Sequence, residues 1–84
     1  MEQCIQVAED ENEEAMELPC EEDNTLLLST LIAQFPGACG LKYRNRETGG
    51  LRGLRIVDGK IFPPGGSWES PVYIAVFPKG DFLL

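Results

Sequence analysis

The segment Val72-Tyr73-Ile74-Ala75-Val76-Phe77 decides the fold of this 84-residue chain. Its residues are apolar or aromatic throughout, so neither face of a strand built from them would be polar. This pattern is typical of a strand buried in the middle of a sheet. We therefore expect the last strand of the chain to lie between strands that come earlier in the sequence.

Two short segments near the N-terminus predict a β-hairpin. Residues 4–8 and 15–19 each alternate polar and apolar side chains, and the acidic link between them suits a hairpin loop. Successive side chains of a strand point to opposite faces. We therefore expect Met16 and Leu18 to face the core and Glu17 to face solvent.

A single helix is predicted after this hairpin. Residues 21–25 are acidic or suited to capping and precede an apolar stretch, and Pro36-Gly37 then ends the helix. A helical projection at about 100° per residue gives one apolar face, with Gln34 at its rim and Leu26 outside it. The predicted apolar face consists of Leu27, Leu28, Leu31, Ile32 and Phe35.

The second half of the chain predicts further strands. Residues 41–45 alternate in polarity, and residues 51–57 form a strand whose interruption by Gly53 indicates a β-bulge. Asp58-Gly59 is a hairpin signal that leads into residues 60–62. A hairpin, one helix and several strands with a buried last strand indicate the α+β class. The expected fold is a ubiquitin-like β-grasp, a mixed sheet with one α-helix on one face.

Charge is distributed very unevenly along the chain, whose net charge is −7. Residues 1–24 hold ten acidic side chains and no basic one, while the rest of the chain holds all seven Lys and Arg residues. Opposite patches on one body attract each other between copies, and such a contact propagates as a filament unless it closes a ring. The alternative is an acidic loop that only keeps a small domain soluble. Overall acidity argues against strong nucleic-acid binding by this segment alone.

Patterns that indicate catalysis or metal binding are missing from the sequence. Histidine is absent, which removes the commonest general base and the commonest metal ligand. Cys4, Cys20 and Cys39 lack the paired spacing of a zinc site and indicate reduced thiols. We expect no enzymatic activity, no cofactor and no metal. No apolar run is long enough for a membrane span, and the first residues do not indicate a signal peptide.

Several segments resemble the amino-terminal domain of the TAR DNA-binding protein family. The longest is A-Q-F-P-G-A-C-G-L at residues 33–41. The others are E-D-E-N at 9–12, L-L-S-T at 27–30, Y-R-N at 43–45, V-Y at 72–73 and P-K at 78–79. The resemblance implies a ubiquitin-like fold of the DIX-like type over residues 1–79, followed by a tail at residues 80–84. It also implies a domain that self-associates head to tail.

The resemblance further implies which residues make the contact between copies. The acidic face consists of Glu14, Glu17 and Glu21, and the opposing basic and polar face consists of Gln34, Arg52 and Arg55. Leu27 and Leu28 correspond to the apolar part of the interface. Thr48 lies in a loop where the family carries a phosphorylatable serine, so it is a possible phosphorylation site.

By the same resemblance, the whole protein is a nuclear RNA-binding protein with some cytoplasmic presence. Its implied roles are pre-mRNA splicing, RNA stability and transcriptional regulation, with RNA or DNA bound by domains outside this chain. The expected partner of the present domain is a second copy of itself, and no membrane partner is expected. Two alternatives remain open: a weak single-stranded nucleic-acid-binding module using residues 42–60, and a ubiquitin-like adaptor for another protein.

Overall fold

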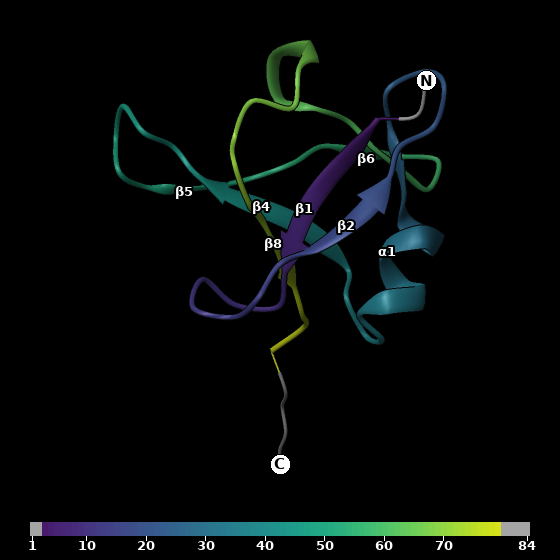
Figure 1. Cartoon of the computed structure of the whole chain (residues 1–84), viewed down its shortest axis with the longest axis horizontal. Helices are drawn as coiled ribbons and strands as arrows, with labels where there is room; N and C mark the ends of the chain where they lie inside the picture. Colours follow the sequence, from purple (N-terminus) through teal and green to yellow (C-terminus); the bar gives the residue numbers. More distant parts are fainter. Residues whose placement is uncertain (1–2, 80–84) are drawn as a thin grey trace.

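The C-terminal strand lies at the centre of a five-stranded sheet. In the computed structural model, which describes residues 3–79, this strand is β8 (Tyr73–Val76). It pairs in parallel with β1 (Cys4–Ala8) and antiparallel with β4 (Gly40–Arg44). The edges are β2 (Met16–Pro19) and β5 (Leu51–Gly53), giving the order β2-β1-β8-β4-β5 (Figure 1). The predicted central strand and N-terminal hairpin are therefore confirmed.

A second, smaller sheet has the order β3-β7-β6. Its strands are β3 (Leu26–Leu27), β6 (Ile56–Val57) and β7 (Lys60–Ile61), and both pairings are antiparallel. Asp58 and Gly59 join β6 to β7 with φ angles of 52° and 73°. Two successive residues with positive φ are typical of the tight turn whose twist matches a hairpin. The hairpin predicted from Asp58-Gly59 is thus confirmed.

Residues 51–57 do not form the single bulged strand that the sequence predicts. The chain leaves the large sheet after Gly53, the last residue of β5, and enters the small sheet at β6. Between them, the Leu54 N–H still donates to the Leu41 carbonyl (3.0 Å), whereas the Arg55 carbonyl accepts from the Phe62 N–H (2.9 Å). The tight β6–β7 hairpin draws residues 56–57 away from β4, so the glycine marks a change of sheet.

The helix is shorter than predicted and starts later. The α-helix α1 spans Leu28–Gln34, and no side chain caps its N-terminus. Leu26 belongs to β3, pairs with Ile61 and is fully buried, although the helical projection placed it outside the apolar face. Ile32, predicted to lie on that face, is exposed, whereas Leu31 is buried as expected. Strand pairing with β7 therefore overrides the helical periodicity at residues 26–27.

The core lies between α1 and one face of the five-stranded sheet. Leu31 of the helix packs with buried side chains from β1, β2, β4 and β8, namely Ile5, Val7, Leu18, Leu41, Tyr73 and Ala75. Met16 was predicted to join them but is 42% exposed, because it is the first residue of β2, next to the β1–β2 loop, whereas Leu18 two residues further on is buried. The α+β class is confirmed, and the arrangement is that of a ubiquitin-like β-grasp. Within residues 3–79, no helix is long and apolar enough to cross a membrane.

Three aromatic rings pack at the end of the central strand. Tyr73 is 1% exposed, its ring centroid lies 5.8 Å from that of Tyr43, and it meets the ring of Trp68 edge-on at 5.2 Å. The Tyr73 hydroxyl accepts from the Ser70 N–H (3.0 Å), and the Trp68 indole N–H donates to the Asn24 carbonyl (2.8 Å). Buried tyrosine and tryptophan need such partners for their polar atoms. The cluster ties the loop before β8 to the loop before β3.

Candidate functional site

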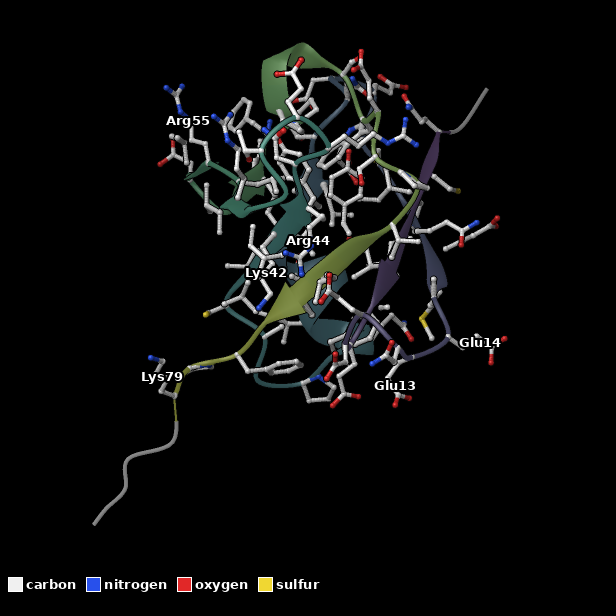
Figure 2. All side chains as sticks on the ribbon, turned by 90° about the vertical axis from the view of Figure 1, so that its left-hand side faces the viewer. Glu13, Glu14, Lys42, Arg44, Arg55 and Lys79 are labelled. Atoms are coloured by element: carbon white, nitrogen blue, oxygen red, sulfur yellow. The ribbon has the colours of Figure 1, made fainter. Side chains whose placement is uncertain are left out.

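The two charged sets lie on opposite edges of the five-stranded sheet. Glu17 is in β2, with Glu14 before that strand and Glu21 after it, whereas Arg52 is in β5 and Arg55 follows β5. All five side chains are exposed, and β1, β8 and β4 separate the two edges. Figure 2 shows Glu14 and Arg55 on opposite sides of the molecule. The sheet order therefore gives the domain an acidic edge and a basic edge.

Arg52 and Arg55 line a hollow of about 560 Å³ on the basic edge. Tyr43 and Phe62 are also in its lining. Within residues 3–79 the ion pairs are Arg44–Glu11 and Lys60–Asp23, so the guanidinium groups of Arg52 and Arg55 remain open to another molecule. A guanidinium presents a planar fork of donors that matches a carboxylate. The basic edge thus presents two guanidinium groups that form no ion pair within residues 3–79.

Gln34 lies beside the acidic edge. It lines a groove of about 580 Å³ between β2 and α1, together with Met16 and Glu17. The resemblance grouped Gln34 with Arg52 and Arg55, which line the separate hollow described above. The structure therefore brings Gln34 together with Glu17, and a role for its amide in a contact between copies stays a prediction.

The two leucines assigned to the apolar interface are half-buried. Leu27 pairs with Lys60 in the small sheet, and Leu28 packs against the core while its N–H donates to the Gly59 carbonyl (2.8 Å). Both therefore have a role within the domain. Only the exposed part of each side chain is left for a second molecule.

Thr48 is exposed in the loop between β4 and β5. Its hydroxyl oxygen accepts from the Gly50 N–H (3.2 Å), and its own N–H donates to the Asn45 side-chain oxygen (3.3 Å). The Asn45 N–H in turn donates to the Gly50 carbonyl (2.8 Å), which closes the loop. The loop leads directly into the strand that carries Arg52, so a charge added at Thr48 would lie near the basic edge.

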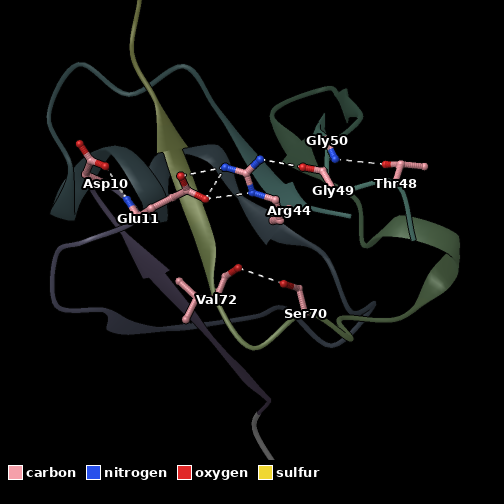
Figure 3. Close-up of polar contacts among 8 residues, drawn as sticks. All are labelled: Asp10, Glu11, Arg44, Thr48, Gly49, Gly50, Ser70 and Val72. Atoms are coloured by element: carbon pink, nitrogen blue, oxygen red, sulfur yellow. Dashed lines mark hydrogen bonds and ion pairs between the residues drawn. The ribbon is translucent and has the colours of Figure 1, made fainter. Parts of the chain in front are cut away.

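Sequence reasoning missed one arrangement near this loop, which is drawn in Figure 3. The Arg44 guanidinium donates to both carboxylate oxygens of Glu11, with distances between 2.7 and 3.1 Å, and to the Gly49 carbonyl (2.7 Å). Glu11 and Arg44 are 33 residues apart. Both lie within segments that resemble the family, but no local pattern indicates that they pair.

Asp23, which is not part of the acidic face, forms a second exposed ion pair with Lys60. It accepts from the Lys60 ammonium (2.8 Å), the Thr25 hydroxyl (2.6 Å) and the Thr25 N–H (3.2 Å). The Lys60 hydrogen bond, followed by those from Thr25, lowers the pKa of Asp23 from 3.8 to about 2. The same contact raises the pKa of Lys60. Asp23 therefore holds the loop before β3 against β7.

Asp23→Asn should reduce the dependence of stability on pH in acid. Because the pKa of Asp23 is lower in the folded state, ionised Asp23 contributes to the free energy of unfolding. This contribution is fully present above pH 3.8, near the pKa of the unfolded state, and is lost as the pH falls through about 2. Urea unfolding at several pH values between 2 and 5 should show a smaller fall in midpoint for the variant than for the parent. Asp58→Asn is the control, since asparagine also adopts the positive φ of that turn position. An identical fall in parent and Asp23→Asn would contradict the assignment.

The cysteines of the described residues are free thiols with different surroundings. Cys20 is buried in the core, and this burial, together with nearby Cys4 and Glu21, raises the pKa of its thiol to about 11. Cys20 is therefore held as a neutral, packed side chain, whereas Cys4 and Cys39 are exposed. Among residues 3–79, no group of three Cys, Asp or Glu side chains is arranged to hold a metal ion.

The fold and the surface together define a small ubiquitin-like domain with two oppositely charged edges. Residues 4–77 match the family described as "TAR DNA-binding protein 43, N-terminal domain". The Tar DNA-binding protein homolog 1 of Caenorhabditis elegans is 36% identical over 80 residues, which cover 92% of this chain and 19% of that relative. The chain therefore belongs to the family of TAR DNA-binding protein N-terminal domains, as the sequence motifs indicated. It spans about a fifth of the length of this curated relative.

Proposed function

We propose that this domain joins copies of its own protein head to tail. The acidic edge of one copy, with Glu14, Glu17 and Glu21, would meet Arg52 and Arg55 of the next. The observation that carries the proposal is that Glu17 lies in β2 and Arg52 in β5, at opposite edges of one sheet, with the other members of each set next to these strands in the sequence. A contact between different patches leaves one free acidic patch and one free basic patch at the two ends of the joined pair, so further copies can add at either end unless the contact closes a ring.

The strength of this contact follows from the exposure of its charges. An exposed ion pair contributes about 0.2–1 kcal/mol, and salt screens it. A few such pairs give a weak contact between two isolated domains. Tethering several copies on one nucleic acid would raise their effective concentration and make the weak contact useful.

Sedimentation velocity over a range of concentrations tests the proposal. We expect the sedimentation coefficient to rise with concentration in low salt and to fall back toward the monomer value in high salt, because the contact is electrostatic. A coefficient that stays at the monomer value at high concentration and low salt would exclude self-association through these edges.

The larger protein, in this proposal, is a non-enzymatic nuclear RNA-binding protein with some cytoplasmic presence. Its roles would be pre-mRNA splicing, RNA stability and transcriptional regulation, with RNA or DNA bound by domains outside this chain. Support comes from family membership and from a relative named as a DNA-binding protein, of whose length this chain covers about a fifth. The domain would then supply assembly, and the other parts would supply recognition.

One observation favours a second function, weak binding of single-stranded nucleic acid. The hollow on the basic edge holds Tyr43 and Phe62 as well as Arg52 and Arg55. Aromatic rings and guanidinium groups together are the usual means of binding bases and phosphates of a single strand. The domain's net charge of −7 opposes this function. Titration with single-stranded DNA at physiological salt separates the two functions, since an assembly module should bind it little.

Thr48→Glu tests the proposed regulation by phosphorylation. A phosphate transferred to the Thr48 hydroxyl by a protein kinase adds a charge of about −1.5 to −2. Near Arg52 this charge should repel the acidic edge of the next copy, so we expect Thr48→Glu to sediment closer to the monomer than the parent at the same concentration. Thr48→Gln, which has a similar size and no charge, is the matched control and should assemble. Equal assembly of both variants would exclude regulation at this position.

A further inference from the structure

Arg44 connects the two loops that border the proposed contact surfaces. It is the last residue of β4, and its side chain reaches Glu11 in the β1–β2 loop and Gly49 in the β4–β5 loop. Because β8 separates β1 from β4 in the sheet, the side chain spans the central strand on the face opposite the core. Figure 3 shows the guanidinium between its two partners, with the Glu11 carboxylate on one side and the Gly49 carbonyl on the other.

Each loop is internally bonded, so a displacement at its contact with Arg44 is carried along the loop. In the β1–β2 loop, residues 9–15, which we call the acidic loop, the Glu11 N–H donates to the Asp10 carboxylate and the Glu13 N–H donates to the Asp10 carbonyl (3.0 Å). Glu14 follows directly. In the other loop, the Gly49 N–H donates to the Asn45 carbonyl (2.7 Å). A shift of Glu11 therefore moves the turn before Glu14, and a shift of Gly49 moves the loop of Thr48.

The chemistry of arginine suits this role. A guanidinium has a rigid planar fork of five donors, so one edge of it, Nε and Nη2, holds the carboxylate bidentately while the other nitrogen, Nη1, donates to the carbonyl. The ion pair is exposed, at 48% for Arg44 and 45% for Glu11, which alone would make it weak. The bidentate contact with the carboxylate and the third bond to the carbonyl together fix the orientation of the guanidinium between the two loops. A lysine ammonium would keep the charge without fixing an orientation.

We propose that Arg44 is a positioning residue that couples the Thr48 loop to the acidic loop within one copy. A negative charge added at Thr48 competes with Glu11 for the Arg44 guanidinium, and release of Glu11 loosens the turn that leads to Glu14. The acidic edge thereby responds to an event at the basic edge on the other side of the sheet. The effect of this coupling on assembly rests on the proposed head-to-tail function. The coupling itself acts within a single copy.

The test is nuclear magnetic resonance of backbone amides in an Arg55→Glu background, where the proposed contact between copies is blocked. Thr48→Glu should shift the amide resonances of residues 9–14 when Arg44 is present, and these shifts should largely disappear with Arg44→Lys or Glu11→Gln. Amide exchange at Glu13 and Gly49 should also accelerate about two- to five-fold in Arg44→Lys, as expected for the loss of an exposed network. Glu13→Gln is the matched control, because it removes a charge from the same loop without touching the bonds to Arg44.

Two outcomes would overturn the coupling. One is that Thr48→Glu leaves residues 9–14 unshifted in the presence of Arg44, and the other is that it shifts them equally with Arg44→Lys. A merely stabilising ion pair would lower the free energy of unfolding when broken but would not transmit the Thr48→Glu signal across β8. Because the measurement uses a single copy, its result stands or falls separately from the sedimentation test of self-association.

Discussion

Arg52→Glu should leave the domain largely monomeric at concentrations where the parent assembles. The substitution places a carboxylate on the basic edge, so the acidic edge of the next copy meets repulsion in place of attraction. Each lost pair costs about 0.2–1 kcal/mol, and like charges brought together cost more. Since about 1.4 kcal/mol corresponds to a factor of ten, we expect the dissociation constant to rise at least about tenfold. Sedimentation velocity in low salt measures the change.

Mixing experiments show whether the contact is head to tail. Glu17→Arg disables the acidic edge and should also give a monomer. A mixture of the Arg52→Glu and Glu17→Arg proteins should associate again, because the intact acidic edge of the first meets the intact basic edge of the second. Lys79→Glu is the control, since it makes the same change in net charge at an exposed site that Figure 2 places well apart from Arg55. Assembly of the Arg52→Glu protein at the parental concentration would contradict the assignment.

The charge polarity of the domain could be predicted from the sequence because it depends on very few structural facts. Glu17 lies in a hairpin strand and Arg52 in a later strand, and a buried last strand must have neighbours on both sides. These facts already place the two residues on different parts of the sheet. The structure adds that β2 and β5 are the two edges, which the sequence pattern alone does not determine.

The sequence predicts less well the first and last residues of helices and strands that end where distant segments pair. Leu26 lay outside the predicted apolar face of the helix because it belongs to a strand, where it pairs with Ile61. A strand of two residues is too short to show a periodic pattern in the sequence. Gly53 resembles a bulge residue, yet the turn at Asp58-Gly59 decides where the strand divides. The Arg44–Glu11 contact is of the same kind, since it joins segments 33 residues apart through side chains that are ordinary in composition. Local patterns predict elements, and the contacts between elements set their ends.

Both edges depend on the central strand, so Tyr73→Ala should weaken assembly by strongly destabilising the domain. Replacing a buried aromatic side chain by alanine costs about 3–5 kcal/mol, because apolar contacts are lost and a cavity is left. Small domains are stable by about 5–15 kcal/mol, and an 84-residue chain lies toward the lower end of this range. We therefore expect a large fall in the urea midpoint. The single tryptophan, Trp68, packs edge-on against Tyr73 and reports unfolding by its fluorescence.

Two companion variants show why the buried ring, and not aromatic character in general, carries this stability. Tyr73→Phe keeps the packing and removes only the acceptor for the Ser70 N–H, which should cost about 1 kcal/mol. Phe77→Ala removes an exposed ring just beyond the end of β8 and should cost less than Tyr73→Ala. Equal midpoints for Tyr73→Ala and Phe77→Ala would contradict a central role for β8. Three strands, β1, β8 and β4, separate the two edges. In a domain this small they hold the edges apart only if the middle strand, β8, is packed on both of its faces.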